Sequence, residues 1–387
     1  GWAEIGGAHS PVRAADSGPS GSGVMIDEPL LRVMFACRGS TREGLGHVMR
    51  SRSVAAEMAR LSSTRVCVVG EPYVETLVSG RGLHFQMLKE ESELITQTEE
   101  FQPHVVVFDA LNFEPRTLAR IREKAMTVSL SPVFNLLNEM DLVFHRTKYL
   151  GDEWIPSRRQ GPEIRAGLQY AVIREQCVTI GPEAYRHSLE QQPLAIVISM
   201  GGADAGNKTL QTLRAIQSVH RPLLIWVLLG EGYGHSYEKL VDCVRQNRQH
   251  EIILAKTSDS MWRVMQNCSL AILAGGTITY EAAHAGLPSI NVFEDGKHVF
   301  LIRELVEKGI CLSAGFPMHD ALDVVAANLS HLEKNREELW NMHQRATGQV
   351  NHSGAERIAK EIIEQYWERR GRYAKPTLAK IKNGTAA

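Results

Sequence analysis

The sequence predicts an α/β protein made of two Rossmann-like domains that face a cleft. Short apolar runs alternate with longer amphipathic stretches, which is the βαβ pattern of a parallel sheet. The alternation stops in a segment rich in Pro and Gly and then starts again. A chain of 387 residues also fits two domains, at about 150 residues per domain.

The first series of apolar runs is rich in Val, Phe and Leu and shows no polar alternation. Strands that are buried on both faces of a parallel sheet have this composition. We therefore expect strands at Leu31–Cys37, Arg65–Val69, His104–Asp109, Met126–Leu130 and Asp141–Phe144. Helices such as His47–Leu61 and Pro115–Lys124 should connect them.

The second series follows the segment that contains Gly161, Pro162, Gly181 and Pro182. The expected strands are Leu194–Met200, Leu223–Leu229, Glu251–Leu254, Leu270–Leu273, Ser289–Phe293 and Ile310–Ser313. The expected helices are Asn207–Ser218, Ser258–Gln266, Thr277–Ala285, Val299–Lys308, Ala321–Leu329, Glu333–Ala346 and Ala355–Trp367. In parallel sheets of this kind, ligands bind at the carboxyl ends of the strands.

These patterns give predicted boundaries at residues 29–183 for the first domain and 184–350 for the second. Residues 1–28 have a Gly- and Ser-rich composition, which indicates a flexible tag or leader. Residues 351–387 should form a helix and a basic tail, which contains Arg369, Arg370 and Arg372. A solvated end is favoured over contact of this tail with a membrane surface.

The composition excludes several classes of protein. Lys and Arg number 43 against 44 Asp and Glu, so the chain is not a generic nucleic-acid-coating protein. No apolar run approaches the roughly 20 residues of a membrane span. The six Cys are scattered without a CxxC pair, which is typical of reduced thiols in a cytoplasmic protein and makes a metal site unexpected.

The first candidate site is the segment at 44–50, GLGHVMR, after the first strand. Gly44 and Gly46 allow a tight turn, and the following helix offers free N–H groups to an anion. His47 stands at the helix start, where it could act as a general base near neutral pH. A plain βα turn with a capping His fits the residues equally well, and the GxGxxG spacing is absent.

Similar turns follow two strands of the second domain. Each could present N–H groups to a phosphate. A structural turn in which Asp204 caps the helix fits the first equally well, and for the second the residues by themselves favour a buried, capping Glu281. Cleft-facing candidates at these and the remaining strand ends are Gly201, Gly202, Asp204, Asn207, Gly275, Gly276, Thr277, Ile278, Glu281, Lys297, His298 and Asp109.

Together these segments resemble the GT-B superfamily of nucleotide-sugar enzymes. The likeness is greatest to the UDP-sugar hydrolase of pseudaminic acid biosynthesis, and it extends to the lipid-linked N-acetylglucosamine transferase of peptidoglycan synthesis. Four segments carry it: GLGHVMRSRSVAAEMA at 44–59, GLQYAVIRE at 167–175, SMGGADAGNKTL at 199–210 and AGGTITYEAAHAGLPSI at 274–290.

The resemblance implies that the second domain binds the nucleotide, that the first binds the acceptor, and that no metal is required. It implies that His47 is the catalytic base or the residue that orients the attacking group, that Gly44 and Gly46 shape its loop, and that Glu281 contacts the ribose. The diphosphate would lie at Gly275, Gly276 and Thr277, while Gly201 and Gly202 would line the same cleft. Tyr170 and Arg174 would belong to the segment that enters the second domain.

The chain departs from the hydrolase pattern in the acceptor half. Ala110-Leu111 replace a His-Tyr pair, Ser129-Leu130-Ser131-Pro132 replace a paired acidic segment, and Lys297-His298 replace an Asn-Gln pair. We therefore expect a metal-independent inverting glycosyltransferase that uses a UDP-sugar and a small-molecule, sugar or lipid-linked hydroxyl. The alternatives are a UDP-sugar hydrolase and a non-catalytic nucleotide-sugar-binding subunit.

Overall fold

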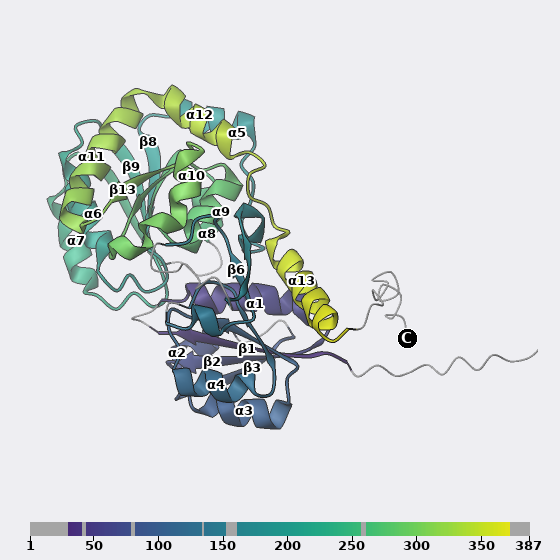
Figure 1. The fold of residues 1–387 in the computed structure, drawn as a ribbon. Helices are drawn as coiled ribbons and strands as arrows, with labels where there is room; N and C mark the ends of the chain where they lie inside the picture. Colours follow the sequence, from purple (N-terminus) through teal and green to yellow (C-terminus); the bar gives the residue numbers. More distant parts are fainter. Residues whose placement is uncertain are drawn as a thin grey trace, which may run out of the picture. The chain divides into compact units, whose positions relative to one another are not determined.

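The computed structural model describes residues 30–40, 44–78, 82–133, 135–151, 161–256 and 261–371. They contain two parallel β-sheets of seven and six strands, which confirms the predicted α/β class (Figure 1). The predicted leader at 1–28 and the tail from Arg372 onward lie outside the described residues.

The first sheet has the strand order β3-β2-β1-β4-β5-β6-β7, and every neighbouring pair is parallel. Its strands are β1 (Arg32–Gly39), β2 (Ser63–Gly70), β3 (His84–Leu88), β4 (Val105–Asp109), β5 (Met126–Ser129), β6 (Leu142–His145) and β7 (Glu163–Ala166). The helices between them are α1 (Gly46–Met58), α2 (Tyr73–Val78), α3 (Glu93–Phe101) and α4 (Pro115–Arg122).

The two edge strands of this sheet, β3 and β7, were not predicted. Their side chains are mostly part-exposed, whereas those of β4 are all buried. An edge strand has a neighbour on one side only, so it need not be a continuous apolar run. The prediction relied on such runs and therefore found only the five central strands.

The second sheet has the order β10-β9-β8-β11-β12-β13 and is also parallel throughout. Its strands are β8 (Leu194–Ser199), β9 (Leu223–Leu229), β10 (Glu251–Lys256), β11 (Leu270–Ala274), β12 (Ser289–Val292) and β13 (Cys311–Gly315). All six coincide with predicted strands to within two residues at each end.

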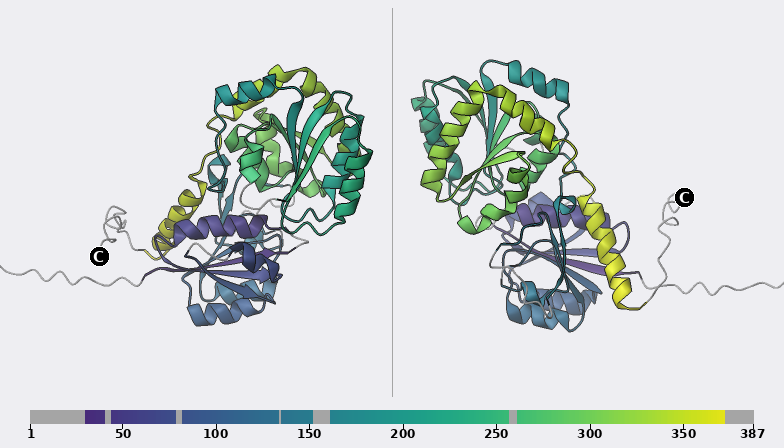
Figure 2. Two further views of the ribbon diagram at one scale, coloured as in Figure 1. Left: turned by 180° about the vertical axis from the view of Figure 1, so that it is seen from behind. Right: turned by 45° about the horizontal axis from the view of Figure 1, so that its top comes forward.

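The helices associated with the second sheet are α5 (Pro182–Glu190), α6 (Lys208–Ala215), α7 (Tyr237–Gln246), α8 (Met261–Met265), α9 (Thr277–Ala285), α10 (Arg303–Glu307), α11 (Met318–Lys334) and α12 (Arg336–Ala346). Helix α9 has the predicted bounds. Residues Gly296–Ile302 form a 3-10 helix, η5, where the sequence predicts the start of an α-helix at Val299. Figure 2 shows the second sheet between its helices.

The last helix, α13 (Gly354–Arg369), packs in the core of the first sheet, although it follows the whole second sheet in the chain. Its Ile358, Ala359 and Ile362 are at most 1% exposed and share a buried cluster with residues of α1 and β1. The opposite face of this sheet is covered by α3 and α4 through Leu94, Leu118 and Ile121 (Figure 1). Within the described residues, no helix is both long enough and apolar enough to cross a membrane.

The strand orders place the candidate site. In each sheet the order reverses between two strands that are neighbours in space but not in sequence, β1 and β4 in the first sheet and β8 and β11 in the second. Ligands bind outside the carboxyl ends of the strands at such reversal points. The segments at 44–50, 199–210 and 274–290 and the residue Asp109 all stand at these four strand ends.

Candidate active site

His47 and Asp109 form the centre of the site at the edge of the first sheet. Asp109 is the last residue of β4, and His47 lies in the first turn of α1, which follows β1. Strands β1 and β4 are paired, with Cys37 opposite Asp109, so the helix that follows β1 begins near the end of β4. The side chains of His47 and Asp109 therefore meet. His47 Nδ1 lies 2.7 Å from Asp109 Oδ1.

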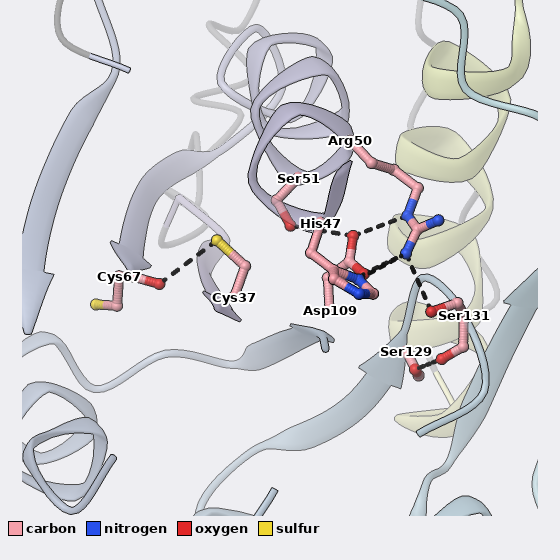
Figure 3. Close-up of polar contacts among 8 residues, drawn as sticks. All are labelled: Cys37, His47, Arg50, Ser51, Cys67, Asp109, Ser129 and Ser131. Atoms are coloured by element: carbon pink, nitrogen blue, oxygen red, sulfur yellow. Dashed lines mark hydrogen bonds and ion pairs between the residues drawn. The ribbon is translucent and has the colours of Figure 1, made fainter. Parts of the chain in front are cut away.

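Two further α1 side chains hold the same carboxylate (Figure 3). Arg50 Nε donates to Asp109 Oδ2 at 2.8 Å, and its Nη2 donates to Oδ1. Ser51 Oγ donates to Oδ2 at 3.3 Å. Arg50 Nη2 also reaches Ser131 Oγ after β5, at 3.0 Å. The carboxylate therefore has donors on both of its oxygens.

The environment of Asp109 keeps it ionised. Burial by itself raises the pKa of this carboxyl, but the charges of Arg50 and His47 and their hydrogen bonds outweigh burial, so that the pKa lies below its ordinary value. An ionised carboxylate only accepts hydrogen bonds, so His47 Nδ1 must donate. The lone pair of His47 is then on Nε2, the nitrogen that a general base would use.

The glycine turns after β8 and β11 look alike in sequence but differ in structure. Asp204 Oδ1 accepts from the N–H of Lys208 at 2.8 Å, and Oδ2 accepts from the N–H of Thr209 at 2.9 Å. The first N–H groups of α6 are therefore capped by the side chain of Asp204, as the structural alternative for this residue predicts. Asn207 adopts a left-handed conformation, and its side chain accepts from Tyr233.

The start of α9 has no such cap. No side chain accepts from its first amides, and within the described residues the N–H groups of Thr277 and Ile278 donate to no other residue. Among the described residues, the N-terminus of α1 likewise has no side-chain cap, and its first turn has no acidic residue. Both ends carry free donors and the positive end of a helix dipole.

These two helix ends converge on one cavity of about 680 Å³. A Cβ atom on Gly46 would lie only 3.8 Å from Thr277 Oγ1. The cavity is lined by Gly44, Gly46 and Arg50 on one side and by Gly276, Thr277 and Ile278 on the other. Gly201 and Gly202 also line it, whereas Gly275 does not: there a Cβ atom would lie 2.0 Å from the ring of Phe293.

Glu281 lines the same cavity, but its carboxylate already has partners. Arg174 Nε donates to Oε1 at 2.7 Å and Arg174 Nη2 to Oε2 at 2.6 Å. Trp262 Nε1 donates to Oε2 at 3.2 Å. Glu281 is 1% exposed, so a ribose would have to share this carboxylate with Arg174.

The remaining predicted residues lie away from the cavity lining. Tyr170 donates its hydroxyl to Glu361 of α13, at 3.0 and 3.1 Å from the two oxygens. Lys297 and His298 lie in η5. Burial is the main cause that lowers the pKa of His298, and the charges of Arg146 and His47 act in the same direction. The side chain of His47 points toward β4, whereas residues 46, 49, 50 and 53 of α1 line the cavity.

The sequence analysis did not name four charged residues of this region as site residues: Arg50, Arg146, Lys208 and Glu294. Arg50 follows His47 by one helical turn, so its position beside His47 was readable from the helical period. Lys208 Nζ lies 3.1 Å from Glu294 and 3.6 Å from Asp204. In the described part of the chain, no three His, Cys, Asp or Glu side chains gather as metal ligands. The expectation of a metal-independent site stays a prediction.

No family model matches the chain. Among curated proteins it is similar to the uncharacterized protein MJ1062 of Methanocaldococcus jannaschii, with 23% identity over 274 residues. The match covers 68% of this chain and 56% of the relative. The chain thus spans about half the length of the curated relative that it matches.

Solved structures resemble it over most of its length. MurG of Acinetobacter baumannii matches with a TM-score of 0.58 and 14% identity, over 86% of this chain and 99% of MurG. Alr3699/HepE of Anabaena in complex with UDP-glucose matches with 0.61 and 12%, over 87% and 100%. MnaA of S. aureus with UDP matches with 0.59 and 13%, over 90% and 99%. The chain has the GT-B fold that these structures share, as the sequence predicts.

Proposed function

We propose that the chain is a UDP-sugar enzyme, and that it acts as a metal-independent inverting glycosyltransferase with His47 as the general base. The observation that carries this proposal is the convergence of two uncapped helix ends on one cavity next to the His47–Asp109 pair. The choice of uridine is supported by the structural neighbours solved with UDP-glucose and with UDP.

In the proposed reaction the diphosphate lies at the start of α9, against the amides of Thr277 and Ile278. An acceptor hydroxyl attacks the anomeric carbon, the bond from that carbon to the diphosphate oxygen breaks, and UDP leaves with the electron pair. Negative charge grows on the diphosphate as it leaves. Each preorganised N–H donor aimed at that charge contributes about 3–4 kcal/mol.

His47 Nε2 takes the proton of the attacking hydroxyl, which is worth about 10²- to 10⁴-fold in rate. Asp109 fixes the tautomer and stabilises the imidazolium that forms. Arg50 holds Asp109 in place through two hydrogen bonds. The proposed mechanism needs no metal ion, because the two helix ends supply positive charge to the leaving diphosphate.

The proposal is tested by measuring UDP release from a panel of UDP-sugars, first without an acceptor and then with sugar, small-molecule or lipid-linked hydroxyls. We expect release only when an acceptor is present. His47→Ala should lower turnover at least about a hundredfold and leave UDP affinity unchanged. His187→Ala, at a side chain that is 75% exposed, is the matched control.

The other outcomes assign other functions. Release that depends on His47 and yields free sugar without an acceptor would identify a UDP-sugar hydrolase. Tight UDP binding without turnover under any condition would identify a binding subunit. Near-normal turnover of His47→Ala would remove His47 from the role of base.

A further inference from the structure

A second guanidinium, that of Arg146, lies near the His47–Asp109 pair. Arg146 follows β6, and its Cζ lies 5.1 Å from the centre of the Tyr280 ring of α9. The charges of Arg50 and Asp109 act on Arg146, and those of Arg146 and His47 act on His298. Strand β6 pairs with β5, and Arg50 reaches Ser131 just after β5 at 3.0 Å, so Arg146 and the side chain of Arg50 lie at the ends of neighbouring strands.

Among the described residues, no carboxylate pairs with Arg146. Asp109 is fully buried and already holds both Arg50 and His47. Arg146 forms no ion pair with any described residue, and its Nε is buried without a hydrogen-bond partner. Tyr280 contacts the face of the guanidinium with its ring and interacts with it through its hydroxyl, but one residue cannot satisfy five N–H donors.

Arg146 nevertheless stays charged at neutral pH. Burial, with the charge of Arg50 acting in the same direction, lowers the pKa of its guanidinium to about 10. Buried guanidinium groups are normally paired with an anion. Within the described part of the chain, the protein thus keeps a cation at this place without pairing it with an anion.

We propose that Arg146, with Arg50, forms an anion subsite beside His47, which binds a carboxylate or phosphate carried by the transferred sugar or by its acceptor. The planar fork of a guanidinium matches both groups. The diphosphate of the nucleotide is served by the free amides of α9 and α1, so this subsite takes a further anion. The inference rests on the proposed function and names the substrate class of the same site.

Two probes distinguish the sources of the anion. UDP-glucose and UDP-glucuronate differ at C6, where a hydroxymethyl group replaces a carboxylate, and calorimetry compares their affinities. Inorganic phosphate added to protein saturated with UDP reports an anion on the acceptor side, through the melting temperature. The variants are Arg146→Met and Arg146→Lys, with the exposed Arg248→Met as matched control.

For a sugar anion, we expect wild type to bind UDP-glucuronate at least about tenfold more tightly than UDP-glucose. For an acceptor anion, we expect phosphate to raise the melting temperature of the UDP-bound protein. Arg146→Met should lose that effect, keep its affinity for UDP, and melt close to wild type, because the substitution leaves no ion-pair partner behind. Arg146→Lys should retain part of the effect.

The subsite is disproved if neither probe shows a preference for the anion, or if the preference survives in Arg146→Met. It is also disproved if Arg146→Met weakens the binding of UDP by the same factor as the binding of UDP-glucuronate, since Arg146 would then bind the diphosphate. If wild type binds no UDP at all, the proposed function fails on its own. Stabilisation of the free protein by phosphate that depends on Arg146 would then still support the subsite, and its absence would overturn it.

Discussion

His47 Nδ1 and Asp109 Oδ1 lie 2.7 Å apart, although the two residues are 62 positions apart in the chain. They meet because β1 and β4 are neighbours in the first sheet, where the strand order reverses. Arg50 and Ser51, on the same helix as His47, complete the hydrogen bonds of the carboxylate. The pair gives His47 a defined tautomer, which a helix-capping His would not need.

Asp109→Asn should lower turnover about 10²- to 10⁴-fold and leave UDP affinity unchanged. The amide can present an N–H group to His47 and so favour the wrong tautomer. Initial rates and calorimetry measure the two effects. Asp242→Asn on α7, at a side chain that is 61% exposed, is the control. A turnover within about threefold of wild type would show that Asp109 has no part in proton transfer.

Glu281→Ala should weaken UDP binding by about 1–3 kcal/mol and also lower the free energy of unfolding, because Arg174 and Trp262 lose their acceptor. Arg174→Met separates the two effects. If Glu281 contacts the ribose directly, Glu281→Ala weakens UDP more than Arg174→Met does. Equal losses by calorimetry would mean that Glu281 acts only by holding Arg174.

Asp204→Ala should lower the free energy of unfolding by about 1–2 kcal/mol, because the N–H groups of Lys208 and Thr209 lose their acceptors. Ser236→Ala removes the cap of α7, whose bond to the N–H of Lys239 is longer at 3.4 Å, and should cost less. Urea unfolding measures both. UDP affinity that falls as steeply in Asp204→Ala as in Glu281→Ala would contradict a purely capping role.

His145 should make the fold sensitive to acid. Burial lowers the pKa of this 1%-exposed imidazole from 6.5 to about 3, and the charge of Arg146 acts in the same direction. Between those pH values the unfolded chain binds a proton that the folded chain does not. Stability is therefore lost as pH falls below 6.5, by up to about 1.4 kcal/mol per pH unit.

Urea unfolding between pH 7.5 and 5 tests this expectation. His145→Gln should show a shallower loss of stability than wild type over that range. His319→Gln, at a side chain that is 79% exposed, should behave like wild type. Identical pH profiles for His145→Gln and wild type would mean that other groups cause the acid sensitivity.

The sequence alone determined the central strands, most of the helices and the turns that carry the candidate site. These features follow from local burial. A strand covered on both faces is a continuous apolar run, and a helix with one buried face repeats its apolar residues every three to four positions. The edge strands β3 and β7 are covered less, so they leave no such pattern.

The tertiary structure alone decided which residues meet. The turns after β8 and β11 have similar glycine patterns, yet the start of α6 is capped by Asp204 while that of α9 is open to the cavity. Helix α13 returns to the first sheet, and Arg146 reaches Tyr280. Parallel strands are joined by long crossovers, so neighbours in space are distant in sequence, and no local pattern reports their contact.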